Sequence, residues 1–324
     1  MMTQATLYPE MEPTSRPRRK QMGKTTLSDS IAQLRLTLRD VEVLEDIYTS
    51  RYMTVPQIQA LHWRESKGGQ AIANLKACQR RMRQLFEHGL VRRIEPLIRY
   101  SEGKKPLIYA LDKGGAQILV NEIGVELAEL DYRPQSAEEN YPFLQHLLDT
   151  TELRIAFTYA AEVAGLHLEL WRNERELKSE GMSDVIILTD PDGKTHKAAV
   201  VPDAVVCFNR DGKRAVFLIE IDRRTVTVDP SKWEKRGWSR KVRTYTAYFE
   251  SEAYKQRYGD VTAHVLTVTT GDKRLAHLKE ATEAAKGGKR FWFSTFEVAT
   301  QKENLLTAPI WARASMDGLY ALLR

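Results

Sequence analysis

The sequence predicts an α+β protein with two folded domains, and three observations support this. Its 324 residues suffice for two domains of ordinary size, and 42% hydrophobic with 28% charged residues is a globular composition. Residues 37–124 have the pattern of helices followed by a hairpin and another helix. Residues 143–324 mix strands with helices, as α/β domains do. The polar segment 131–142, with two prolines, predicts a linker between the two patterns.

Residues 1–36 are predicted to form a basic arm without regular structure. The first 29 residues have no hydrophobic periodicity and contain three prolines. Their basic residues are Arg16, Arg18, Arg19, Lys20 and Lys24. A phosphate-binding arm and a merely solubilising tail both fit this composition, so both interpretations stay open.

Residues 37–130 are predicted to form the first domain. Thr37 is the expected N-cap of a helix that follows it, and Pro56 suits the first turn of a second helix. A third helix covers about 70–88 and ends before Gly89, the expected C-cap glycine. Two strands within 90–100 and 106–112 flank a turn, and a short helix follows. This order predicts a winged helix-turn-helix, whose third helix lies in the major groove of DNA.

The predicted third helix and wing are basic. Lys76, Arg80 and Arg83 follow each other at i, i+4 and i+7, beside the apolar stripe of the helix. A solvated helix face explains any one of them, whereas the whole pattern favours double-stranded DNA as the partner. Gln70, Asn74 and Gln79 add hydrogen-bond donors. The expected DNA-binding residues are Lys76, Arg80, Arg81, Arg83, Arg92, Arg93, Arg99, Lys104 and Lys105.

Several runs of the chain resemble one known family. In the first domain these runs are LRDVEVLEDIYTSRYMTVPQIQALHW, RRMRQLFEHGLVRR and LIYALDKGGAQIL. In the second domain they are HLLDTTELRIAF, VPDAVVCF, FLIEIDRRT and KVRTYTAY. Over about residues 37–270 the chain is similar to the replication-relaxation family, whose members are associated with plasmids and other mobile elements. The resemblance implies DNA binding in replication, relaxation or maintenance of such elements, without implying a defined reaction.

Two acidic residues of the second domain, 143–324, are candidates for chemistry. The predicted strands 198–208 and 214–222 flank the turn signal NRDG. If Asn209 pairs with Gly212, Asp203 lies opposite Leu218 and diagonal to Glu220, on one face of the sheet. Carboxylates at this spacing repel unless a cation lies between them, and oxygen ligands suit Mg²⁺ or Mn²⁺. No other cofactor is indicated.

This layout resembles the PD-(D/E)xK nuclease fold. The resemblance implies that Asp203 and Glu220 hold a divalent metal and are catalytic, with Glu152 as an upstream acidic residue. The chain departs from the pattern at Asp222, where a lysine is expected, and Lys241 is the candidate replacement from the following helix. An active nuclease, a non-catalytic relative and an unrelated sheet with structural ion pairs therefore all stay open.

Three other side chains, His146, Trp233 and Trp238, allow two interpretations each. His146 could orient Glu152 or touch a phosphate, but a lone histidine on a helix is more often packed. Trp233 and Trp238 stand among basic residues of 232–243, where they could bind nucleic acid or cover the sheet, and packing is favoured for Trp238. Cys78 and Cys207 lie in apolar surroundings and are predicted core residues.

Composition and missing motifs exclude several function classes. Two distant cysteines make neither a disulfide framework nor a zinc site. There is no signal peptide and no stretch of 18 apolar residues, so a cytoplasmic location without membrane contact is expected. Walker, GxGxxG, HExxH and GxSxG motifs are absent, which excludes ATP-driven, dinucleotide and serine-hydrolase chemistry.

The favoured function is therefore a DNA-binding protein without catalysis, acting on plasmids or mobile elements. Net charge +6 and pI of about 9.1 agree with an acidic partner. The first alternative is a Mg²⁺-dependent endonuclease or nickase. The second is a module that binds replication or partition proteins, and a homodimer also stays open.

Overall fold

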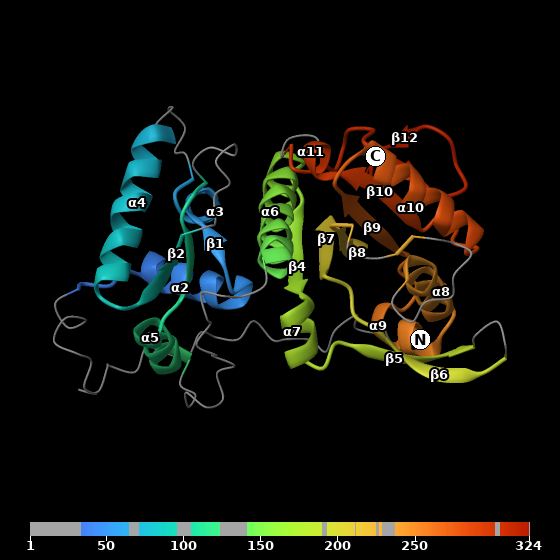
Figure 1. Ribbon diagram of the computed structural model, residues 1–324, viewed down its shortest axis with the longest axis horizontal. Coiled ribbons are helices and arrows are strands. Elements are labelled where there is room, and N and C mark those ends of the chain that lie inside the picture. The colour runs from blue at the N-terminus through green and yellow to red at the C-terminus, as the bar shows by residue number, and fades with distance from the viewer. Residues whose placement is uncertain are drawn as a thin grey trace. The chain divides into compact units, whose positions relative to one another are not determined.

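A computed structural model of the chain divides into two compact units, one ending at Ile155 and the other beginning at Ala156 (Figure 1). The structure describes residues 34–64, 71–95, 105–123, 141–189, 193–210, 212–224, 227–228, 237–301 and 305–323. The predicted basic arm lies outside these residues, except for its last three. Of those three, Leu34 and Leu36 pack against the core of the first unit, so the folded chain includes part of the predicted arm.

The first unit begins with the three predicted helices, α2 (Leu38–Ser50), α3 (Val55–His62) and α4 (Ala71–Glu87). Thr37 caps α2 and Thr54 caps α3, each with its side-chain oxygen accepting from the backbone N–H three residues later. After α4, Gly89 adopts φ 70°, a left-handed conformation that glycine adopts without strain. The expected N-cap at Thr37 and the C-cap glycine are therefore confirmed.

A three-stranded antiparallel sheet completes this order, with α5 (Lys113–Ile123) after it. Its strands are β1 (Met53–Thr54), β2 (Val91–Ile94) and β3 (Ile108–Leu111), in the order β1-β3-β2. The sequence did not predict β1, because two residues are too short to show alternation. On β3, Tyr109 and Leu111 face the core formed by the helices, whereas Ile108 and Ala110 face a second, smaller cluster.

The helix α6 (Tyr141–Val163) contributes to both units. Leu148, in its first half, packs with Tyr52 and Ile108 in that smaller cluster. Phe157, in its second half, lies 6.0 Å from the ring of Phe208. The division into units therefore falls inside a helix, further along the chain than the polar segment 131–142 that predicted the boundary. Apolar residues on both halves of α6 explain why the chain does not divide earlier.

The second unit contains a seven-stranded mixed sheet, in the order β12-β11-β10-β9-β8-β7-β4. Strands β8, β9 and β10 are parallel, and the remaining pairs are antiparallel. The bounds are β4 (His167–Asn173), β7 (Ala204–Arg210), β8 (Lys213–Asp222), β9 (Ala263–Thr269), β10 (Phe291–Thr295), β11 (Trp311–Arg313) and β12 (Leu319–Tyr320). The mixed architecture confirms the predicted α+β class.

Helices α8 (Trp238–Phe249), α9 (Glu252–Tyr258) and α10 (Asp272–Ala284) share one apolar core with this sheet. A separate hairpin, β5 (Asp184–Thr189) with β6 (Thr195–Val200), packs on the same core. Arg257 of α9 holds Asp184 at the start of this hairpin with two hydrogen bonds of 2.6 Å. The helices α7 (Glu174–Ser179) and α11 (Phe296–Ala299) are short, and the sequence did not predict them.

Two predicted elements of the second unit are each divided in the structure. The strand expected at 198–208 is the end of β6 and the start of β7, with Pro202 between them. Proline lacks the N–H that a central strand donates, so the ladder stops there. The helical pattern at about 231–257 predicts one helix, and its described part, from residue 237 on, is α8 followed by α9, because Ser251 begins a new helix as its N-cap.

None of the helices in the described ranges combines the length and the apolar character needed to span a membrane.

Candidate DNA interface and a buried carboxylate cluster

The outward side of α4 has exposed basic side chains. Lys76 and Arg80 are exposed, and no ion pair involves them among the described residues. Arg83 is also exposed and forms a 2.7 Å ion pair with Glu87, one turn further along. The opposite side of α4 inserts Cys78, Met82 and Leu85 into the core. The helix is thus amphipathic as predicted, with Gln79 also exposed and Gln70 outside the described residues.

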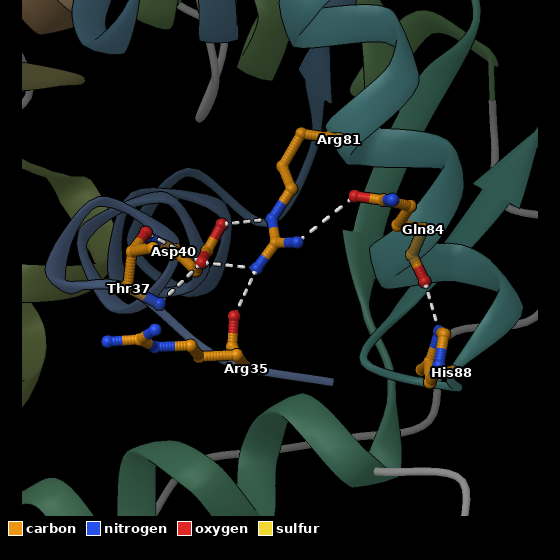
Figure 2. A network of polar contacts seen from close by, with 6 residues as sticks. All are labelled: Arg35, Thr37, Asp40, Arg81, Gln84 and His88. Atoms are coloured by element: carbon orange, nitrogen blue, oxygen red, sulfur yellow. Dashed lines mark hydrogen bonds and ion pairs between the residues drawn. The ribbon is translucent and has the colours of Figure 1, made fainter. Parts of the chain in front are cut away.

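Arg81, predicted to contact DNA, is instead bonded to the inside of the first unit (Figure 2). Its Nε and Nη2 donate to the two carboxylate oxygens of Asp40 at 2.8 and 2.6 Å, and Nη1 donates to Gln84. Burial would raise the pKa of Asp40, but hydrogen bonds from Arg81 and Thr37 hold it below its usual value. Arg81 therefore belongs to a largely buried ion pair, and a DNA contact by Arg81 stays a prediction.

The two arginines of β2 lie on opposite faces of the small sheet. Arg93 stacks on the ring of Phe86, at 5.0 Å from its centroid, and both residues are exposed. Arg92 pairs with Ala110, on the face of the smaller cluster, and its buried Nη2 has no hydrogen-bond partner among the residues that the structure describes. Arg92 and Arg93 therefore do not share one surface. Lys105 is half-buried, and the predicted residues Arg99 and Lys104 lie outside the described residues.

In the second unit, Asp203 lies directly before β7 and Glu220 lies on the neighbouring strand β8. Val205 pairs with Leu218, so the register differs by two residues from the one expected from the sequence. The strands meet at Arg210 and Lys213, which leaves only two residues in the turn. Continued by one step, this register places Asp203 directly across from Glu220 rather than diagonal to it. Asp203 Oδ2 also accepts a 2.7 Å hydrogen bond from the backbone N of Ile221.

Lys241 reaches Glu220 from α8, as the sequence predicted. Its Nζ lies 2.5 Å from Glu220 Oε2, and the hydroxyl of Tyr245, one turn later, donates to Oε1 at 2.5 Å. Burial and the nearby charge of Asp203 raise the pKa of Glu220 to about 7, although Lys241 opposes this. Burial would lower the pKa of Lys241, but Glu220 and Asp203 raise it above its usual value. The result is a buried carboxylate held by a cation and a phenol.

Asp222, at the position where the nuclease pattern has lysine, forms a different buried ion pair. Arg274 Nε and Nη2 donate to its two carboxylate oxygens at 2.8 and 2.7 Å. Thr269 on the neighbouring strand donates to the same carboxylate. Asp222 is 3% exposed, so this contact is structural and leaves Lys241 as the lysine that accompanies Asp203 and Glu220.

Glu152, the predicted upstream acid, is bonded within the first unit. Gln57 of α3 donates to its Oε2 at 3.2 Å, and to the backbone of Leu148 at 2.8 Å. On the same helix, Thr150 donates to the backbone oxygen of His146, which is half-buried. These contacts fit a role in attaching α6 to α3. A catalytic role for Glu152 stays a prediction.

Asp203 and Glu220 offer carboxylate oxygens, the kind of ligand that a divalent metal ion needs. Mg²⁺ is typically held by one or two carboxylates together with water and substrate phosphate, which Asp203 and Glu220 fit. Both oxygens of Glu220 and one of Asp203 already accept hydrogen bonds. Within the part of the chain that the structure describes, no three His, Cys, Asp or Glu residues are grouped to hold a metal. Any ion here would therefore need further ligands from water or phosphate.

Sequence reasoning missed Tyr245 and Asp40. Tyr245 follows Lys241 by four residues, so the helical spacing placed both side chains on one face of α8, and this signal was available. Asp40 was hidden because its partner Arg81 is distant in sequence. Trp238 is buried and donates to Thr282 at 2.8 Å, which confirms packing, whereas Trp233 lies outside the described residues. Cys78 and Cys207 are buried, as expected for core residues.

Comparison with known proteins identifies the family of the chain. No curated protein matches it. A solved structure of the restriction endonuclease FokI bound to DNA matches at 11% identity and a TM-score of 0.25, over 81% of this chain and 43% of that one. The chain thus spans less than half of that protein, and so low a TM-score supports no conclusion. The family model for replication-relaxation proteins matches residues 44–263, more than half of the chain. The chain therefore belongs to the replication-relaxation family.

Proposed function

We propose that the first unit binds double-stranded DNA as a winged helix, with α4 in the major groove. The observation that supports this most directly is the exposed side of α4, where Lys76 and Arg80 have no ion-pair partner among the described residues. Cationic side chains at successive turns of one helix suit the phosphates and guanine edges that line a major groove. Exposed Arg93 on β2 and half-buried Lys105, shortly before β3, add basic side chains near the hairpin, and Arg93 also pairs with Glu95 at 3.2 Å.

The family gives this DNA binding a biological setting. Replication-relaxation proteins are associated with plasmids and other mobile elements, so membership points to replication or relaxation of such DNA. The winged helix would deliver the second unit to that DNA.

Salt-dependent binding tests this proposal. Fluorescence anisotropy with duplex DNA should show an affinity that falls steeply with salt, because bound phosphates release counterions. Replacing Arg80 and Arg83 with alanine should weaken binding and reduce the slope of log K against log salt by roughly 0.9 per lost contact. Lys255→Ala is a matched control, since this exposed lysine of α9 is already paired with Glu252. Affinity that does not change with salt would indicate a protein-binding module instead.

A second candidate function rests on one specific observation, the contact between Lys241 and Glu220 beside Asp203. We infer that this cluster is the site of a metal-dependent DNA endonuclease or nickase. Asp203 and Glu220 would hold Mg²⁺ or Mn²⁺, which supplies electrostatic stabilisation of the phosphate when bound. The ammonium group of Lys241 would place a positive charge beside the two carboxylates. The hydroxyl of Tyr245 would fix the orientation of the Glu220 carboxylate.

Incubation with supercoiled plasmid and Mg²⁺ or Mn²⁺ tests the second candidate. Nicking should be lost in Asp203→Asn and in Glu220→Gln, while the affinity for DNA is retained. Tyr248→Phe is the control, because this buried tyrosine of α8 bonds to Asp184 rather than to the cluster. DNA binding by every variant without any cleavage would leave a non-catalytic DNA-binding protein.

A further inference from the structure

Asp40 sits at a junction of the first unit, 1% exposed and fully hydrogen-bonded (Figure 2). Its Oδ2 accepts from the backbone N and the hydroxyl of Thr37, both at 2.7 Å, and so closes the capping box of α2. The same carboxylate accepts both hydrogen bonds from Arg81 of α4. One side chain therefore fixes the start of α2 and one side of α4 together.

Arg81 extends this connection in two directions. Its Nη2 also donates to the backbone oxygen of Arg35 at 2.9 Å, which ties the segment before α2 to α4. Its Nη1 donates to Gln84 at 3.0 Å, one turn further along the helix. Four of the five guanidinium N–H groups are thus used inside the protein, and one remains. A planar guanidinium bound at both ends of a carboxylate fixes orientation as well as distance.

We infer that the Asp40–Arg81 pair is a positioning device that sets the orientation of α4 in the proposed DNA interface. This inference rests on the proposed DNA binding of the first unit. The pair does not touch DNA. It holds α4 at the angle from which Lys76, Arg80 and Arg83 reach the groove together. A small rotation of a long helix moves the ends of its side chains by several ångströms, so this angle decides how many contacts form at once.

A second acid–arginine pair on α4 provides an internal comparison. Arg83 and Glu87 are 77% and 47% exposed, whereas Arg81 and Asp40 are 20% and 1% exposed. Glu87 only competes with DNA for Arg83, because it lies on the surface of the same helix. Asp40 is buried and joins α4 to another helix. The same acid-to-amide change should therefore have opposite effects at these two positions.

The test is the affinity for one DNA duplex of the full-length variants Asp40→Asn and Glu87→Gln. Each removes one negative charge, and simple electrostatics predicts tighter binding for both. We expect Glu87→Gln to bind about twofold to threefold more tightly, because one competing surface charge is removed. We expect Asp40→Asn to bind roughly fivefold to tenfold more weakly, because the orientation of α4 is no longer held. Tighter binding by Asp40→Asn would overturn the positioning role.

Arg81→Gln separates positioning from direct contact. We expect weaker binding with an unchanged slope of log K against log salt, whereas Arg80→Ala should make the slope shallower by about 0.9. The double variant Asp40→Asn with Arg81→Gln replaces the ion pair by two amides and should recover part of the affinity. A shallower slope for Arg81→Gln would show that Arg81 contacts phosphate and would overturn the inference.

A variant that is only less stable could also bind DNA more weakly, so the test needs a control for stability. Leu119→Ala removes a buried side chain of α5 outside the pair and is the control for destabilisation. At a temperature where every variant is folded, Leu119→Ala should bind DNA within twofold of the wild type. Equal weakening by Leu119→Ala and Asp40→Asn would contradict positioning. If the wild type does not bind DNA, the proposed function itself is wrong. If the wild type binds DNA and the Asp40 and Arg81 variants bind equally well, only the positioning inference is wrong.

Discussion

Glu220 is a buried acid whose ionisation depends on its neighbours. Burial raises its pKa from 4.5 to about 7, so between these values the folded protein binds more protons than the unfolded chain. The protonated state of Glu220 therefore favours folding at low pH. This contribution decreases as the pH rises from about 4.5 and is lost above about 7.

Glu220→Gln should remove this pH dependence from the free energy of unfolding. Relative to the variant, the wild type should lose roughly 1–3 kcal/mol between pH 4.5 and 7.5, the order expected for a raised acid pKa. Calorimetry of both proteins across this range, with EDTA present, measures the difference. Parallel pH profiles would show that Glu220 titrates at its ordinary value.

The pair of Asp222 and Arg274 gives a second prediction for single residues. Arg274→Ala leaves the buried carboxylate of Asp222 with only Thr269 as a donor among the contacts described above. Loss of one partner of a buried ion pair costs about 3–5 kcal/mol, because the remaining charge stays unpaired. Lys279→Ala, which breaks a surface pair with Glu283, should cost under about 1 kcal/mol. Urea unfolding of both variants measures the contrast, and equal losses would contradict it.

Sequence reasoning located some of these site residues and missed others for identifiable reasons. Lys241 was found because a lysine was missing from β8 and the next helix could supply one. Arg81 was assigned to DNA because its charge was visible in the sequence, whereas its partner Asp40 lies 41 residues away. An ion pair between residues far apart in the chain produces no periodic pattern in the sequence, so the Asp40–Arg81 pair could not be predicted. The sequence correctly predicted that Asp203 and Glu220 share one face of the sheet. The predicted register was wrong by two residues, and a shift of two residues leaves each side chain on the same face.

At the scale of elements, long amphipathic helices were predictable and short pieces were not. The apolar stripe of α4 and the cap of α2 gave bounds within about two residues. Strands β1 and β12 have two residues each, too few for any pattern. Their pairing is decided by contacts with β3 and β11. The position of Pro202 could have divided the strand expected at 198–208, because proline rarely occupies a central strand.

The cap of α3 can be tested as an element. Thr54 Oγ1 accepts from the backbone N of Gln57, and the Gln57 side chain accepts from the backbone N of Thr54. Thr54→Ala should lower the free energy of unfolding by about 1 kcal/mol, and Thr54→Ser, which keeps the hydroxyl, by much less. Urea unfolding measures both. If serine and alanine cost the same, the methyl group of Thr54 rather than its hydrogen bond stabilises this turn.

At the scale of the whole molecule, two cores lie in one chain and α6 contributes to both. The first half of α6 gives Leu148 to the cluster with Tyr52, and Arg154 forms a 2.7 Å ion pair with Asp46 of α2. His62 of α3 contacts the other oxygen of Asp46 at 2.9 Å. The first unit is therefore completed by a segment that the sequence assigned to the second domain. The polar residues 131–142 predicted a boundary, but packing of later apolar residues decides where a compact unit ends.

This arrangement predicts how the first unit behaves when it is cut from the chain. A fragment ending at Ile155 keeps Leu148 and its neighbours, whereas a fragment ending at residue 140 loses them. Burial of one leucine is worth about 1.5–3 kcal/mol, so the shorter fragment should unfold at a clearly lower urea concentration. Leu148→Ala in the longer fragment should reproduce part of that loss, because it removes most of the same buried side chain. If both fragments unfold at the same midpoint, α6 does not stabilise the first unit, and the boundary lies in the polar segment after all.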